Sequence, residues 1–82
     1  MYSLEWKEHA LQNIEKLEPS IARRIVKKVE ELSEHPFSKD IKRLKGSNDF
    51  RHRVGDYRVI FFIEKEKIII LKFGHRKHIY ER

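Results

Sequence analysis

The sequence predicts an α+β fold, a helical hairpin packed on a mainly antiparallel four-stranded sheet in the order β-α-α-β-β-β. Two changes in the spacing of apolar residues support this fold: the spacing becomes helical at Lys7 and alternates again near Phe50. In addition, β-branched and aromatic residues fill two runs, 57–63 and 68–73, that only a short polar turn separates. A chain of 82 residues has room for one core, so we expect a single domain over residues 1–82.

The first half of the chain is predicted to supply one edge strand and both helices. Residues 2–6 alternate as a short strand does, and helices are expected at 7–17 and 20–35. The second helix must end before Pro36, because a proline disfavours helical geometry in the preceding residue. The apolar stripes are Trp6, Ala10, Ile14 and Leu17, and then Ile21, Ala22, Ile25, Val26, Val29 and Leu32. Neither helix can bury its stripe alone, so both should lie on the sheet.

The second half is predicted to supply the other three strands, at 49–54, 57–63 and 67–73. Gly55 and Asp56 have the chemistry of a tight turn between the first two of these strands. The last two strands are apolar at nearly every position, so we expect them to be central in the sheet and covered on both faces.

Composition restricts the partners and the chemistry. The formal charge of +6 favours a polyanionic partner. The absence of cysteine excludes disulfides and thiolate zinc sites, and no histidines and carboxylates have metal-ligand spacing, so we expect neither a metal nor a cofactor. The start of the chain is acidic rather than like a signal peptide, and the longest apolar run, Val59–Ile63, cannot cross a membrane. We therefore expect a cytoplasmic protein.

Basic and aromatic side chains gather at the ends of the predicted strands. Arg51 and Arg53 should share one face of their strand, opposite the apolar side that carries His52. A loop before this strand is also basic, with Lys42, Arg43 and Lys45. Guanidinium, imidazole and phenol groups together can hold a phosphodiester and stabilise the charge that develops on one.

The chain resembles the RelE/ParE superfamily of toxins and is most similar to the ribosome-dependent RelE branch. The resemblance covers almost the whole chain, and its motifs are Leu44-Lys45-Gly46, Val54-Gly55-Asp56-Tyr57-Arg58 and the ending Gly74-His75-Arg76 to Tyr80. It implies a type II toxin, bound in a hetero-oligomer by a RelB-like antitoxin. The RelE branch further implies cleavage of mRNA in the ribosomal A site, by attack of the RNA 2′-hydroxyl on the adjacent phosphate.

The same resemblance implies roles for particular residues. The catalytic residues would be Arg53, Arg58, Arg76, His78 and Tyr80. The RNA-binding residues would be Arg51, His75, Lys42, Arg43 and Lys45.

The general base stays open, because the chain departs from relatives that carry lysines on the second strand. Arg51 and Arg53 stand there instead, and arginine effectively never loses its proton. Proton transfer is therefore left to His75 and His78, since imidazole titrates near neutrality. Other branches use a histidine just before the terminal tyrosine, which favours His78.

Several candidates also have a structural interpretation. Arg58 could pair with Asp56 or Glu64, the ring of Tyr80 could be a packing anchor, and His52 is expected to be half-buried rather than catalytic. The helical band Arg23, Arg24, Lys27 and Lys28 is accompanied by Glu30 and Glu31. A solvated helix face is its simplest interpretation, and contact with ribosomal RNA is the functional one.

A rival to the enzyme is a non-catalytic toxin: a ParE-like inhibitor of DNA gyrase, or a basic RNA- or ribosome-binding module that blocks the A site. ParE-like chains share the fold but generally lack the complete arginine and tyrosine set. That set therefore favours the enzyme, although fold alone cannot decide.

Overall fold

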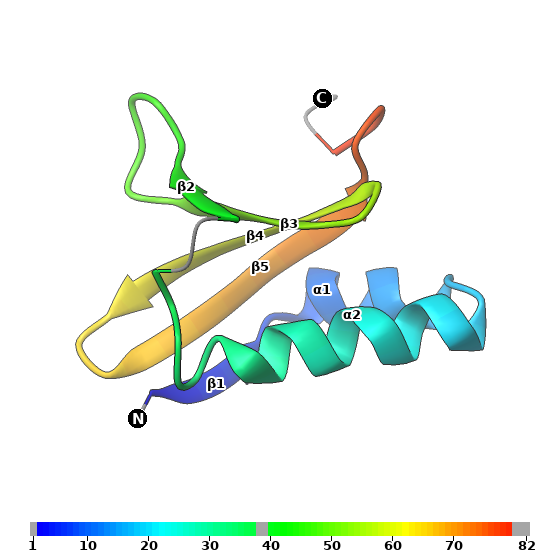
Figure 1. Ribbon diagram of the computed structural model, residues 1–82, viewed down its shortest axis with the longest axis horizontal. Helices are drawn as coiled ribbons and strands as arrows, with labels where there is room; N and C mark the ends of the chain where they lie inside the picture. The colour runs from blue at the N-terminus through cyan, green and yellow to red at the C-terminus, as the bar shows by residue number, and fades with distance from the viewer. Residues whose placement is uncertain (1, 38–39, 80–82) are drawn as a thin grey trace.

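In the computed structural model, residues 2–37 and 40–79 are described, and they form two helices and one five-stranded sheet (Figure 1). The elements are β1 (Ser3–Trp6), α1 (Glu8–Glu15), α2 (Pro19–Glu31), β2 (Ile41–Arg43), β3 (Phe50–Val54), β4 (Tyr57–Glu64) and β5 (Lys67–His75). The strand order is β1-β5-β4-β3-β2; β1 runs parallel to β5, and all other neighbours are antiparallel. The predicted α+β class is confirmed, with β1 at an edge.

Two details of the prediction were wrong. Strand β2 was missed, because three residues are too few to show a pattern; pairing with β3 creates it, with Ile41 opposite His52 and Arg43 opposite Phe50. Helix α2 ends at Glu31 rather than near residue 35. Beyond that residue, tighter turns continue toward Pro36, and the backbone N–H of Leu32 donates to the carbonyl of Val29 at 2.9 Å.

Both helices pack on one face of the sheet, where the core lies. From the sheet come Val59, Phe61 and Ile68, which are fully buried. The helices contribute Ala10 and Val29 to the same cluster, also without exposure. The apolar residues of the two helical stripes, apart from Ala22 and Val26, therefore belong to this cluster or pack against it, as their spacing predicts. No helix in residues 2–37 or 40–79 is long and apolar enough to cross a membrane.

A β-bulge in β5 determines which of its side chains reach the core. Ile60 of β4 pairs with Lys72, but the next residue, Phe61, pairs with Ile70, so Leu71 is an extra residue. The bulge lets Ile70 and Phe73, three positions apart, both join the core. It also moves Lys72 to the face that carries no helix, where simple alternation would not place it.

The sheet face opposite the helices, called here the open face, carries no helix in the described part of the chain (Figure 1). The helical hairpin therefore packs on one face of the central strands, as expected, and no helix supplies the cover that was expected on their other face in the described part of the chain. Ile60 and Ile69 on this face are nevertheless only 3% and 5% exposed. Ile60 has Arg51 and Lys72 as its cross-strand neighbours, whose aliphatic stems can cover apolar surface. At the ends of this face rise the β2–β3 loop and the C-terminal turn (Figure 1).

Candidate functional site

The open face brings basic side chains from four strands into two rows. In one row Lys42 pairs with Arg51, and Lys72 lies further along, beyond Ile60. In the next row Arg53 and Arg58 are direct cross-strand partners. The register thus confirms that Arg51 and Arg53 share a face, opposite the buried His52. The Arg51 Nε is itself buried and has no partner in the described part of the protein.

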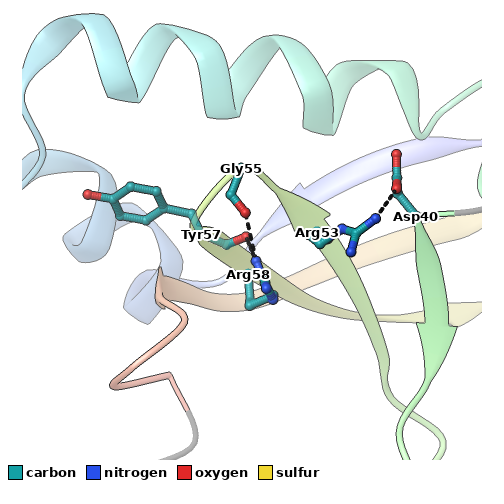
Figure 2. Close-up of polar contacts among 5 residues, drawn as sticks. All are labelled: Asp40, Arg53, Gly55, Tyr57 and Arg58. Atoms are coloured by element: carbon teal, nitrogen blue, oxygen red, sulfur yellow. Dashed lines mark hydrogen bonds and ion pairs between the residues drawn. The ribbon is translucent and has the colours of Figure 1, made fainter.

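Arg53 is held toward the β2 side of the face by Asp40. Its Nη2 lies 3.1 Å from the Asp40 Oδ1, and its backbone N–H donates to the Asp40 carbonyl at 3.0 Å (Figure 2). The backbone bond continues the β2–β3 pairing by one residue. Because both side chains are more than a third exposed, the ion pair orients Arg53 more than it stabilises the fold.

The side chain of Arg58 is held not by a carboxylate but by the backbone of the adjacent β3–β4 turn. Its Nη1 donates to the carbonyl oxygens of Gly55 at 2.9 Å and Tyr57 at 3.0 Å (Figure 2). The structure shows no pairing of Arg58 with Asp56 or Glu64, the structural alternative considered from sequence. Like charges directly opposite on neighbouring strands repel. Here each arginine is bound to a different partner, Arg53 to Asp40 and Arg58 to the turn carbonyls, and these contacts offset that repulsion.

Arg76 lies beside the same turn. Its backbone N–H donates to the Asp56 carbonyl at 2.7 Å, and its Nε is 3.9 Å from the Asp56 Oδ1. Both side chains are more than half exposed, so this ion pair is weak and the Arg76 guanidinium can exchange partners.

His75 and His78 lie near each other at the C-terminal end of β5. The His75 ring packs edge-on against Tyr57 with centroids 5.6 Å apart, and the His78 ring is 6.2 Å away. The Lys77 N–H donates to the His75 Nδ1 at 3.2 Å, which leaves Nε2 as the proton-carrying nitrogen of the neutral ring. His78 lines a pocket of about 270 Å³ together with Lys72.

The C-terminal turn is anchored by Ile79, which is 6% exposed. Its Cδ1 is 3.5 Å from the position that a Cβ would take on Gly74, and Gly74 is the cross-strand partner of Arg58. Tyr80, the remaining candidate, lies outside the described residues.

The basic loop is divided between the two faces. Lys42 belongs to the open face, but Arg43 pairs with Phe50 and so lies on the other side. The Arg43 guanidinium donates to the Ser47 carbonyl at 3.1 Å and to the Asn48 Oδ1 at 2.8 Å, which gives it a role in holding the loop. Lys45 is exposed within the same loop.

His52 is separated from the site by the sheet itself. It is 6% exposed and faces the helices, and no hydrogen bond to its Nδ1 is found among residues 2–37 and 40–79. Burial lowers the pKa of its imidazole below the usual range, and nearby Asp40 opposes this. His52 is therefore more deeply buried than the half-buried position expected from the sequence.

Two residues of the site, Lys72 and Asp40, were not among the candidates from sequence. The face on which Lys72 lies depends on the bulge in β5, and the position of Asp40 depends on the short strand β2 that follows it. Neither feature could be predicted from the sequence. In the described ranges, no group of three or more histidines and carboxylates could hold a metal ion.

A family model for the ParE toxin of the type II toxin–antitoxin system parDE matches residues 4–80. The chain belongs to this toxin family. It is thus the toxin component of a type II toxin–antitoxin system within the RelE/ParE superfamily. No individually curated protein matches the sequence.

Solved structures agree with the family. The RelBE2 toxin–antitoxin complex of Mycobacterium tuberculosis matches with a TM-score of 0.83 and 28% identity, over 92% of this chain and 98% of that one. The archaeal RelE–RelB complex of Pyrococcus horikoshii has a TM-score of 0.81 and 26% identity, over 94% and 97%. The E. coli RelBE complex, at 24% identity and a TM-score of 0.78 over 92% and 96%, supports the fold alone. The M. tuberculosis and P. horikoshii structures each hold a toxin in complex with its antitoxin.

Proposed function

We propose that this toxin is a ribosome-dependent endoribonuclease that cleaves mRNA in the A site and so inhibits translation, acting in the cytoplasm. The observation that supports it best is the cross-strand pair Arg53 and Arg58, whose guanidiniums keep donors beyond those bound to Asp40 and to the turn carbonyls. Arg51 and Lys72 extend the positive surface on either side of Ile60. A phosphodiester fits this arrangement in charge.

In the proposed reaction, the 2′-hydroxyl of the RNA attacks the adjacent phosphorus. A new P–O bond forms, the bond to the 5′-oxygen breaks, and the products are a 2′,3′-cyclic phosphate and a 5′-hydroxyl. Negative charge grows on the phosphoryl oxygens in the transition state. Arg53 and Arg58 would stabilise that charge, with Arg76 at the rim, because guanidinium groups fixed beforehand need little reorganisation.

Proton transfer is assigned to the C-terminal residues, since the arginines cannot act as bases. His78 and His75 are the candidates for taking the proton of the 2′-hydroxyl, and Tyr80 for assisting departure of the 5′-oxygen. In neutral His75 the Nε2 carries the proton, because Nδ1 accepts the Lys77 N–H, so this geometry suits His75 to donating a proton and leaves His78 as the better candidate for the base. The ribosome would align the message, so that modest groups suffice.

The antitoxin is proposed to neutralise the toxin by covering the open face with an acidic segment. Among residues 2–37 and 40–79, the basic side chains of the site have few acidic partners: Asp40 pairs with Arg53, and Asp56 pairs with Arg76. Carboxylates of an antitoxin helix could replace the phosphate between Arg53 and Arg58.

The second candidate is a ParE-like inhibitor of DNA gyrase, favoured by the family model that matches the chain. A gyrase inhibitor needs a binding surface but no aligned phosphate site.

One experiment separates the two functions. A message is translated in vitro with and without the toxin, and the 5′ ends of its fragments are mapped; DNA supercoiling by gyrase is measured in parallel. New 5′-hydroxyl ends at A-site codons, lost with Arg53→Ala, support the nuclease. Inhibited supercoiling with an intact message would instead support the gyrase inhibitor.

A further inference from the structure

Arginines from α2, from β4 and from the C-terminal turn lie at the two-residue turn between β3 and β4. Arg24 of α2 lies against Gly55, with its Nη2 3.1 Å and its Cζ 3.4 Å from the place of a Cβ on that glycine. Arg58 binds the carbonyl of the same glycine, and Arg76 pairs with the neighbouring Asp56. The turn runs beside α2, with Arg58 on its other side (Figure 2).

Gly55 makes the contact with Arg24 possible. Its φ of +60° belongs to the left-handed region that glycine favours, and a Cβ there would press on the guanidinium. Unlike Arg53 and Arg58, Arg24 has a guanidinium that forms no hydrogen bond or ion pair with any described residue. Its donors therefore remain available to a ligand beside the turn.

We propose that this turn carries a second phosphate-binding site, in which Arg24 extends the open face over the turn onto α2. The inference rests on the proposed function: an RNA strand whose scissile phosphate lies between Arg53 and Arg58 would continue over Gly55 and place another phosphate on Arg24. Arg58 joins the two sites, because it lies on the open face and also binds the Gly55 carbonyl. This continuity favours a nucleic-acid strand over a separate acidic protein.

The neighbouring Arg23 provides a matched control. Both arginines are exposed on α2, and replacing either removes one positive charge. The three atoms nearest to a Cβ built on Gly55 all belong to the Arg24 guanidinium. A difference between their variants therefore reports position rather than net charge.

The test measures binding of a short single-stranded RNA whose 2′-hydroxyls are methylated, so that it cannot be cut. Fluorescence anisotropy gives the Kd from about 50 to 200 mM salt. We expect Arg24→Gln to weaken binding roughly two- to fivefold and to reduce the salt slope by about 0.7, the loss of one phosphate contact on a single strand. Arg23→Gln should keep the parent slope. Arg24→Lys should also keep the parent slope, because the positive charge binds the phosphate and the contact of the guanidinium with Gly55 does not.

Equal slopes for the Arg23 and Arg24 variants, or no RNA binding by the parent, would overturn the proposal. The proposal would also be overturned if Arg24→Gln weakened the binding of poly-glutamate as much as the binding of RNA. That result would indicate that the turn binds an acidic protein. Thermal unfolding of each variant checks that the fold is unchanged. A failure of the proposed function looks different: Arg24-dependent RNA binding without cleavage on ribosomes would reject the nuclease and keep this site.

Discussion

The two faces of the sheet differ sharply, although the same strands build both. On the helix-bearing face, β3 presents Phe50, His52 and Val54 to the core; on the open face it presents Arg51 and Arg53. The helix-bearing face buries apolar surface, and this burial favours folding. The second carries charges that contribute little to folding and have few internal partners.

This division shows where stability and function should separate. Residues on the helix-bearing face should affect unfolding, and residues on the open face should affect activity. Adjacent residues of one strand can test this directly, because their side chains alternate between the faces.

The largest effect is expected at Phe61 and Phe62, adjacent phenylalanines on opposite faces of β4. Phe61 is fully buried among the helices, and Phe62 is half-buried on the open face. Phe61→Ala should lower the free energy of unfolding by about 3 to 5 kcal/mol, because it leaves a cavity in the core. Phe62→Ala should cost about 1 to 2 kcal/mol, because little cavity forms. Equilibrium unfolding in urea measures both; equal losses would refute the separation of the faces.

The next effect is the loss of activity without loss of stability at Arg58. Arg58→Ala should lower the rate of mRNA cleavage roughly 10²-fold or more, because it removes stabilisation of the transition-state charge. Its hydrogen bonds to the turn carbonyls are partly exposed, so the free energy of unfolding should change by no more than about 1 kcal/mol. Arg23→Ala is the control for charge. Full activity in a folded Arg58→Ala protein would make the residue structural.

A smaller, pH-dependent effect is expected from the C-terminal histidines. If His78 or His75 transfers a proton, its replacement by Gln should flatten part of the pH–rate profile between about pH 5 and 8. Arg76→Lys should instead lower activity at every pH, because it keeps the charge but loses the paired donors. Single-turnover cleavage on programmed ribosomes isolates the chemical step. Unchanged profiles in both histidine variants would exclude imidazole from proton transfer.

Much of the fold could be predicted because its signals are local. The period of 3.6 located both helices, and dense β-branched runs located β4 and β5. Strand β2 could not be predicted, because three residues have no period and exist as a strand only through pairing with β3. The end of α2 was placed too late for a related reason: Pro36 limits a helix but does not require it to continue that far.

The candidate site was predicted where it depends on alternation and missed where it depends on irregularity. Alternation placed Arg51 and Arg53 on one face. The bulge at Leu71 places Lys72 on that face, and no residue pattern predicted the bulge. The Asp40–Arg53 ion pair joins two segments through sheet pairing, which sequence spacing does not show.

The smallest predicted effect concerns His52, the polar residue on the buried side of β3. Burial lowers its pKa in the folded protein; Asp40 and Glu31 oppose this, and Lys28 adds to it. The unfolded chain therefore takes up a proton near pH 6.5, before the folded protein does. As pH falls from this value to the folded pKa, the unfolded state gains protons and stability declines; above it the contribution is complete. Each tenfold difference in proton affinity is worth about 1.4 kcal/mol. His52→Leu should therefore flatten the fall in Tm between pH 7.5 and about pH 5, whereas the exposed His9→Gln should not. If the Tm of the His52→Leu protein falls with decreasing pH as steeply as that of the parent, other groups cause the acid sensitivity.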